Sequence, residues 1–190
     1  MSDTKVRVAV VGASGAFGLK HLDGLAQIDD AEVTVVSGTK LESTQEVADK
    51  YGVPTAVVGL EPVLERDDVD AVILATPTPV HAEQAQAVLA AGKHVQVEIP
   101  LADSLADAEA ALAAAEASGK VAMVGHTRRF NPSHQWVHHK ITDGEFNVQQ
   151  MDVQTYFFRR KNINAKGEPR TWTDHLLWHH AAHTVDLFAY

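Results

Sequence analysis

The sequence has 190 residues, of which 45% are hydrophobic, and it carries a net charge of −9 and no cysteine. The negative charge argues against nucleic-acid binding, and no stretch is long and apolar enough to span a membrane. Without cysteines the chain forms neither disulfides nor thiolate metal sites. Because the first predicted strand starts near Lys5 and leaves no room for a signal peptide, we expect a cytoplasmic globular protein.

Charge is distributed unevenly along the chain. Residues 1–125 hold 8 Lys and Arg against 19 Asp and Glu, a net charge of −11, whereas residues 126–190 hold 8 against 6, a net charge of +2. Ten of the twelve aromatic residues also follow position 125. A change this sharp predicts two domains, 1–125 and 126–190. The basic, aromatic second part is typical of a site for a small anionic organic molecule.

The first predicted element is a strand over residues 6–11, followed by glycines at every third position, Gly12, Gly15 and Gly18. Helical spacing of apolar residues follows directly. A strand, a glycine turn and a helix are the context in which a helix N-terminus binds the pyrophosphate of a dinucleotide. The spacing is one residue longer than usual, so an ordinary turn is the alternative. The predicted cofactor ligands in this turn are Gly12, Ser14, Gly15, Ala16 and Phe17.

A second strand is predicted over residues 32–37, and the residues at its end select the cofactor. NAD enzymes usually place a carboxylate there to bind the ribose 2′-hydroxyl. This chain has Ser37, Thr39 and Lys40 instead, which suit a 2′-phosphate. We therefore expect NADP, with NAD possible if this loop is simply solvated. A capping box at Ser43 predicts that the next helix starts there and ends at Tyr51.

Further strands are predicted at 55–58, 71–75, 94–97 and 121–124, with helices at 80–91 and 105–118 between them. This alternation predicts an α/β fold with a doubly wound parallel Rossmann sheet. The loop after the fourth strand carries Thr76, Pro77, Thr78 and His81. Because open α/β sheets bind ligands at the carboxyl ends of their strands, we expect this loop to contact the cofactor.

After residue 125 the pattern changes. A helix is predicted to end near Asp143, and residues 147–158 alternate between apolar and polar, which predicts a half-exposed strand. That strand would begin an α+β second domain with a mostly antiparallel open sheet. A cationic loop over 159–172 then leads into a helix rich in histidine.

His179 and His183 are four residues apart on that helix, so they face the same side, and Asp186 follows three residues later. An imidazole can accept the hydroxyl proton that is released when a C–H bond gives up hydride. We expect His179 and His183 to act as base and substrate-orienting group, in either assignment, with Asp186 orienting one of them. Buried structural histidines and a zinc site are the alternatives. We predict no metal, because hydride transfer needs none.

Planar guanidinium groups bind carboxylates through paired hydrogen bonds. The predicted ligands of an anionic substrate are therefore arginines, with neutral partners beside them; a solvated basic face is the alternative. These residues are Arg128, Arg129, Arg159, Arg160, Arg170, Asn162, Asn164 and Trp172.

Several motifs together resemble the Gfo/Idh/MocA oxidoreductase family. They are the glycine turn, the Ala75–Thr78 stretch with His81, Glu98-Ile99-Pro100, Arg129-Phe130-Asn131-Pro132, and His183 with Asp186. The resemblance implies that Glu98 and Pro100 also line the cofactor site. This chain departs from the family at Ile99, where a lysine is common, and at His179, where an aspartate is common, so proton transfer would depend on histidines.

The resemblance also implies an activity. It points to an NADP-dependent dehydrogenase of aromatic-acid breakdown that oxidises the hemiacetal of a ring-cleavage semialdehyde to a pyrone dicarboxylate. The resemblance therefore implies a polycarboxylate substrate. We expect a homodimer or other homo-oligomer joined through the second domain. Family members are longer, so we expect the chain to be a fragment. A dehydrogenase of a sugar or cyclitol hydroxyl and a non-catalytic NADP-binding sensor are the alternatives.

Overall fold

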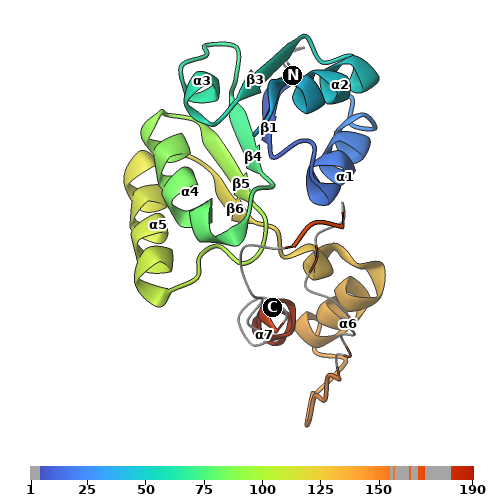
Figure 1. The fold of residues 1–190 in the computed structure, drawn as a ribbon. Helices are drawn as coiled ribbons and strands as arrows, with labels where there is room; N and C mark the ends of the chain where they lie inside the picture. The colour runs from blue at the N-terminus through green and yellow to red at the C-terminus, as the bar shows by residue number, and fades with distance from the viewer. Residues whose placement is uncertain (1–4, 155, 157–162, 164–166, 170–180) are drawn as a thin grey trace. The chain divides into compact units, whose positions relative to one another are not determined.

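The structure is a computed structural model that describes residues 5–154, 156, 163, 167–169 and 181–190. It contains two compact units, Met1–Gly125 and His126–Tyr190, which are described separately. Figure 1 traces the chain through its helices and strands. Among the described residues, no helix has both the length and the apolar character needed to cross a bilayer.

The first unit is built on a six-stranded parallel sheet with strand order β3-β2-β1-β4-β5-β6. This order confirms the predicted doubly wound Rossmann sheet. Because it runs outward in both directions from β1 and β4, the chain reverses its winding between these two strands. The strands are β1 Val6–Val11, β2 Ala31–Gly38, β3 Thr55–Val58, β4 Ala71–Leu74, β5 His94–Val97 and β6 Ala122–Val124.

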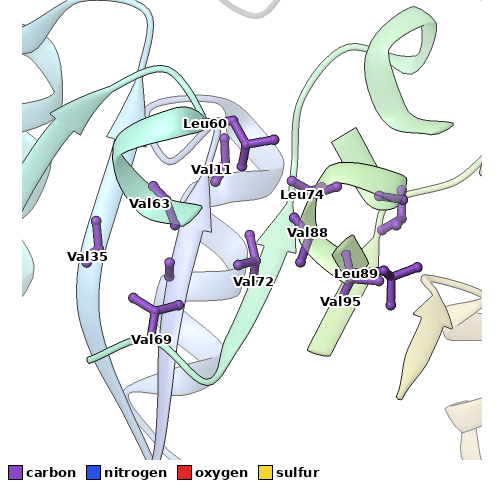
Figure 2. Close-up of a cluster of buried hydrophobic side chains, with 13 residues drawn as sticks. Val11, Val35, Leu60, Val63, Val69, Val72, Leu74, Val88, Leu89 and Val95 are labelled. Carbon is purple, nitrogen blue, oxygen red and sulfur yellow. The ribbon is translucent and has the colours of Figure 1, made fainter. Parts of the chain in front are cut away.

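Helices cover both faces of this sheet, and successive side chains of a strand serve opposite faces. On one face, Val11, Leu74 and neighbouring strand residues pack with Val63 and Val88 (Figure 2). On the other face, Val10 packs with residues of the first two helices. A parallel sheet buried on both sides needs apolar residues at consecutive positions, as Val8–Val11 supply. The helices of this unit are α1 Ala16–Leu25, α2 Leu41–Tyr51, α3 Glu61–Leu64, α4 His81–Ala90 and α5 Leu105–Ser118, with a 3-10 turn η1 Thr78–Val80.

Two helix starts show where local signals succeed and fail. Ser104 caps α5, the helix predicted at 105–118, because its hydroxyl accepts a hydrogen bond of 3.1 Å from the Asp107 N–H. The capping box predicted at Ser43 is wrong, since α2 begins at Leu41 with Lys40 as its N-cap. Inside the first turn the Thr44 hydroxyl donates to the Lys40 carbonyl instead, at 2.8 Å.

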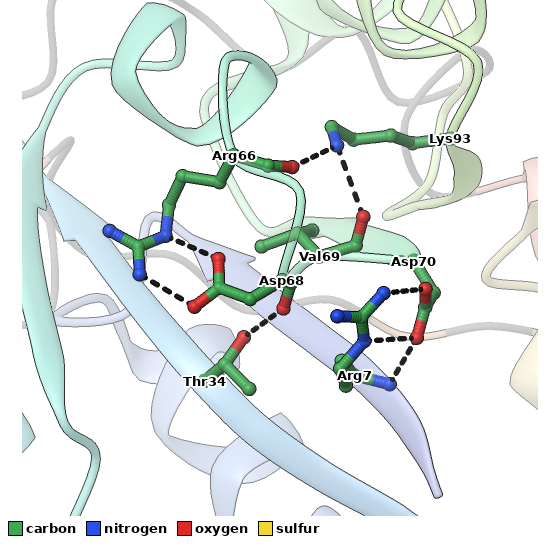
Figure 3. A network of polar contacts seen from close by, with 7 residues as sticks. All are labelled: Arg7, Thr34, Arg66, Asp68, Val69, Asp70 and Lys93. Atoms are coloured by element: carbon green, nitrogen blue, oxygen red, sulfur yellow. Dashed lines mark hydrogen bonds and ion pairs between the residues drawn. The ribbon is translucent and has the colours of Figure 1, made fainter. Parts of the chain in front are cut away.

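The amino-terminal edge of the sheet is held by a network of charged residues (Figure 3). Arg7 donates three hydrogen bonds to the Asp70 carboxylate, one from its backbone N–H and two from its guanidinium, at 2.6–2.9 Å. The buried Lys93 ammonium donates to the Arg66 and Val69 carbonyls at 2.6 and 3.0 Å. These contacts join β1 to the loop before β4 at the edge opposite to the glycine turn.

The second unit contains a 3-10 turn η2 Thr127–Phe130, helix α6 Pro132–Thr142 and helix α7 Ala182–Ala189. Asn131 caps α6 by accepting a hydrogen bond from the Ser133 N–H at 3.0 Å. The strand predicted over 147–158 is wrong for the part that the structure describes, residues 147–154 and 156, which are not assigned to a strand. Alternation of apolar and polar residues predicts only which side chains share a face. A strand also needs a neighbouring strand for its backbone hydrogen bonds. An isolated antiparallel bridge pairs Ile163 with Pro169.

Candidate cofactor site and a histidine–arginine cluster

The carboxyl ends of the central strands form one edge of the first unit. Backbone hydrogen bonds connect Ala75 N–H to Val11, Glu98 N–H to Leu74, and Gly125 N–H to Val97, at 2.7–3.0 Å. The last residues of β1, β4 and β5 therefore lie side by side, and the loops that follow them begin at the same edge of the sheet. Doubly wound sheets bind their ligands at this edge, where the strand order reverses.

The glycine turn after β1 is packed so tightly that two of its glycines, Gly12 and Gly18, leave no room for a Cβ atom. Gly12 has a φ of +82°, and a Cβ placed there would collide with the Ala75 carbonyl. A Cβ on Gly18 would collide with the Gly12 carbonyl. Helix α1 therefore begins directly against the turn, which is what close approach of a backbone to a pyrophosphate requires.

The N-terminus of α1 suits an anion. Gly15 is its N-cap and contributes no side chain, and the first turn carries no acidic residue. The next two residues, Ala16 and Phe17, are exposed. The first N–H groups of a helix lack acceptors within the helix and lie at its positive end, so they bind phosphate well. The glycine turn thus fits a dinucleotide.

At the end of β2 the three predicted cofactor ligands differ. Ser37 is 1% exposed, and its hydroxyl donates to the Gly59 carbonyl at 2.6 Å. Its own carbonyl accepts from the Gly12 and Ala13 N–H groups at 2.9 and 3.0 Å. Ser37 therefore holds the glycine turn in place. Thr39 and Lys40 are exposed at the N-terminus of α2.

The loop after β4 is secured by His81. This side chain is 1% exposed, and its ring nitrogens lie 2.7 Å from the Thr76 carbonyl and 2.8 Å from the Pro100 carbonyl. The Thr76 hydroxyl donates to Gln84 at 2.6 Å. Thr78 is also buried, whereas Pro77 is exposed. His81 therefore connects the loops after β4 and β5 and does not itself face outward.

Sequence reasoning missed a partner of Glu98. The Glu98 carboxylate lies 2.6 Å from the Nε2 atom of His21, on α1, and the two side chains are only 13% and 22% exposed. A histidine in a cofactor-binding helix carries no spacing signal of its own. The pair could have been found only by knowing that α1 and the end of β5 approach each other.

The second unit brings together four of its polar side chains. Arg129 donates to both oxygens of Asp186, from Nε at 2.8 Å and from Nη2 at 2.6 Å. His126 Nδ1 lies 3.6 Å from the same carboxylate. The His126 and His183 rings meet edge to face with centroids 6.4 Å apart. The structure therefore groups two predicted site residues of α7 with Arg129 and with His126, which sequence reasoning overlooked.

Hydrogen bonding and burial shift the pKa values of two residues in this cluster, Asp186 and His126. The hydrogen bonds from Arg129 lower the pKa of Asp186 below the ordinary value of a carboxyl group. Burial lowers the pKa of His126, although the nearby Asp186 opposes this shift. At neutral pH the cluster therefore holds an ionised carboxylate beside a neutral imidazole, and Arg129 is already paired with an acid. Because Arg129 is paired with Asp186, this pairing competes with the predicted role of Arg129 as a ligand of substrate carboxylates.

The structure describes only some of the remaining predicted site residues. Within the described part, no three His, Asp or Glu side chains gather in a way that would hold a metal ion. Arg128 is described and partly exposed, and its carbonyl contacts His134 Nδ1 at 3.0 Å. The predicted site residues that fall outside are Arg159, Arg160, Asn162, Asn164, Arg170, Trp172 and His179.

Comparison with known proteins shows which family the chain resembles over both of its units. Residues 6–126 match the Gfo/Idh/MocA oxidoreductase family with its NAD-binding Rossmann fold, and residues 132–190 match the C-terminal region of bacterial oxidoreductases. Among solved structures, the WlbA dehydrogenase from Bordetella pertussis, in complex with NADH and UDP-GlcNAcA, is 31% identical with a TM-score of 0.71. The alignment covers 77% of this chain and 42% of that one.

Two curated relatives differ in their similarity to the chain. The 4-carboxy-2-hydroxymuconate-6-semialdehyde dehydrogenase of Sphingobium sp. (strain NBRC 103272 / SYK-6) is 67% identical over 97% of this chain and 58% of its own length. Inositol 2-dehydrogenase of Rhodococcus erythropolis is 38% identical over 76% of this chain and 42% of its own. The chain thus spans about half the length of these relatives. Its sequence, strand order and glycine turn place it in the Gfo/Idh/MocA oxidoreductase family.

Proposed function

We propose that the protein is an NADP-dependent dehydrogenase that oxidises the hemiacetal form of 4-carboxy-2-hydroxymuconate-6-semialdehyde to 2-pyrone-4,6-dicarboxylate, in the protocatechuate 4,5-cleavage route of aromatic-acid degradation. The observation that carries this proposal is the 67% identity, over 97% of the chain, to the dehydrogenase named for that semialdehyde. In this proposal residues 1–125 are the cofactor domain. Residues 126–190 begin the domain for substrate and assembly, and the protein is a cytoplasmic homo-oligomer.

The first unit would bind NADP. The turn from Gly12 to the first N–H groups of α1 would hold the pyrophosphate, and the nicotinamide supplies the hydride acceptor. Exposed Lys40 and Thr39 would bind the 2′-phosphate, since a hydroxyl and a cation, and no carboxylate, directly follow β2. Ser37 and His81 would act indirectly, by holding the loops that contact the cofactor.

The second unit would handle the proton and the carboxylates. For oxidation of the hemiacetal, this unit would supply an imidazole that takes the hydroxyl proton as the C=O bond forms, and the bound nicotinamide would accept the hydride of the C–H bond. His183, with His179 as the other candidate, would take that proton. Asp186, held by Arg129, would orient the cluster. The substrate carboxylates would then bind Arg128, Arg159, Arg160 or Arg170.

The test is absorbance at the reduced-nicotinamide band after the protein is mixed with NADP and the ring-cleavage semialdehyde. We expect turnover that is faster with NADP than with NAD, and a His183→Ala variant that loses turnover but still binds NADPH. Faster turnover of inositol would favour a cyclitol dehydrogenase, in line with the 38% identical relative. NADPH binding without turnover of either substrate would favour a sensor.

A further inference from the structure

The contact between His21 and Glu98 joins two segments 77 residues apart. His21 lies in the second turn of the helix that begins at the glycine turn, and Glu98 directly follows β5. Because a carboxylate oxygen only accepts, His21 donates its Nε2 hydrogen to Glu98. The two side chains are mostly shielded from water, so the imidazole fixes where the carboxylate points.

Alternation along β5 shows on which face Glu98 lies. Val95 and Val97 pack into the cluster formed with α3 and α4. Gln96, and by the same period of two Glu98, belongs to the opposite face, on which α1 lies. One oxygen of the Glu98 carboxylate meets His21 on α1. The pair therefore crosses the sheet edge where the strand order reverses.

This position determines which end of a dinucleotide meets the carboxylate. The pyrophosphate binds at the N-terminus of α1, and the adenosine ribose binds at the end of β2. The nicotinamide must therefore extend in the other direction, over the ends of β4 and β5, where Glu98 lies. The oxidised nicotinamide ring carries one positive charge, and the reduced ring is neutral. A carboxylate at this end attracts the oxidised ring more strongly.

We infer that Glu98, oriented by His21, makes the protein bind the oxidised dinucleotide in preference to the reduced one. This inference rests on the proposed NADP binding. Glu98 would act by its charge, so removing the charge should change the ratio of the two affinities. His21 is a positioning residue that acts through Glu98. A purely structural contact would change both affinities alike and leave their ratio as it was.

The test measures the dissociation constants of NADP⁺ and NADPH for the unaltered protein and for Glu98→Gln, by calorimetry and by nucleotide fluorescence. Glutamine keeps the shape and can still accept the bond from His21. We expect Glu98→Gln to weaken NADP⁺ binding at least fivefold more than NADPH binding. The matched control is Glu109→Gln, an exposed residue of α5 that removes the same charge elsewhere and should leave the ratio unchanged.

The role of His21 is tested by two variants. His21→Ala removes the donor and should change the affinity ratio at least threefold, in the same direction as Glu98→Gln. His21→Gln restores a donor and should return the ratio to within twofold of the unaltered protein. An unchanged ratio in Glu98→Gln overturns the inference while leaving the proposed NADP binding intact. Failure of the unaltered protein to bind either nucleotide overturns both.

Discussion

Arg129 donates two hydrogen bonds to Asp186, which lies 57 residues later in the chain. The pair joins η2 to α7, the helix that carries His183. The Arg129 side chain is 40% exposed and that of Asp186 is 11% exposed, so solvent screens the attraction on one side only. The pair therefore serves to hold α7 in place more than to bind an external anion.

A double-mutant cycle with Arg129→Gln and Asp186→Asn measures this pair. Because Arg129 is partly exposed, we expect a coupling free energy of about 1 kcal/mol from urea unfolding. The pKa of Asp186 is lowered in the folded state, so the stabilisation is present above the ordinary carboxyl pKa of about 3.9 and is lost as the pH falls below it. Strictly additive effects of the two substitutions would contradict the expectation.

His126 should make the stability of the second unit depend on pH. Burial lowers its pKa below the ordinary value of about 6.5, so the unfolded chain binds the proton more readily. Stability should therefore fall as the pH drops below about 6.5, and His126→Gln should reduce this slope. The check is unfolding followed by tryptophan fluorescence at pH 7 and pH 5. Equal slopes for both proteins would argue against a buried neutral imidazole.

Gly12→Ala should damage the glycine turn. The left-handed φ of +82° and the collision with the Ala75 carbonyl both oppose a methyl group, so we expect a loss of at least about 2 kcal/mol in unfolding free energy. NADPH binding should weaken by more than tenfold. The matched control is Gly24→Ala in α1, where a Cβ meets nothing within 4 Å. That substitution should leave stability equal or slightly higher, because alanine favours helix.

Lys40→Ala tests the choice between NADP and NAD. Removing a cation from a 2′-phosphate site should raise the dissociation constant of NADPH at least tenfold, about 1.4 kcal/mol, and that of NADH less than twofold. Lys50→Ala removes the same charge from the other end of α2 and should change neither value. If Lys40→Ala raises the dissociation constants of NADPH and NADH equally, Lys40 does not bind the 2′-phosphate.

Asp70→Asn tests the network at the amino-terminal edge. Hydrogen bonds from Arg7 lower the pKa of Asp70 to about 2, so its stabilisation is present above pH 4 and is lost as the pH falls toward 2. Because both side chains are 37% exposed, screening reduces the expected cost of the substitution to about 1 kcal/mol at pH 7.

Urea unfolding at pH 7 and pH 3 provides the measurement. The difference between Asp70→Asn and the unaltered protein should shrink at pH 3. Asp67→Asn, at an exposed position three residues earlier, is the control and should have little effect at either pH. A cost that does not change with pH would show that Asp70 acts through packing instead of charge.

Local patterns were enough to predict most elements of the first unit. The strands predicted at 55–58 and 94–97 are β3 and β5 with those bounds, and Gly52 and Gly119 end α2 and α5 in the left-handed conformation. These features depend on side chains a few residues apart, so the sequence contains their causes. The strand predicted over 147–158 is wrong for the described residues 147–154 and 156, because alternation of apolar and polar residues does not identify a partner strand.

By itself, the sequence determined the order of strands and helices, the glycine turn and the family to which the chain belongs. Only the tertiary structure decided which distant side chains meet. It turned the Ser37 hydroxyl inward, paired Arg129 with Asp186, and brought His21 to Glu98. The physical reason is that such pairs form between segments that become neighbours only through sheet order and helix packing. Residue spacing along the chain carries no record of that proximity.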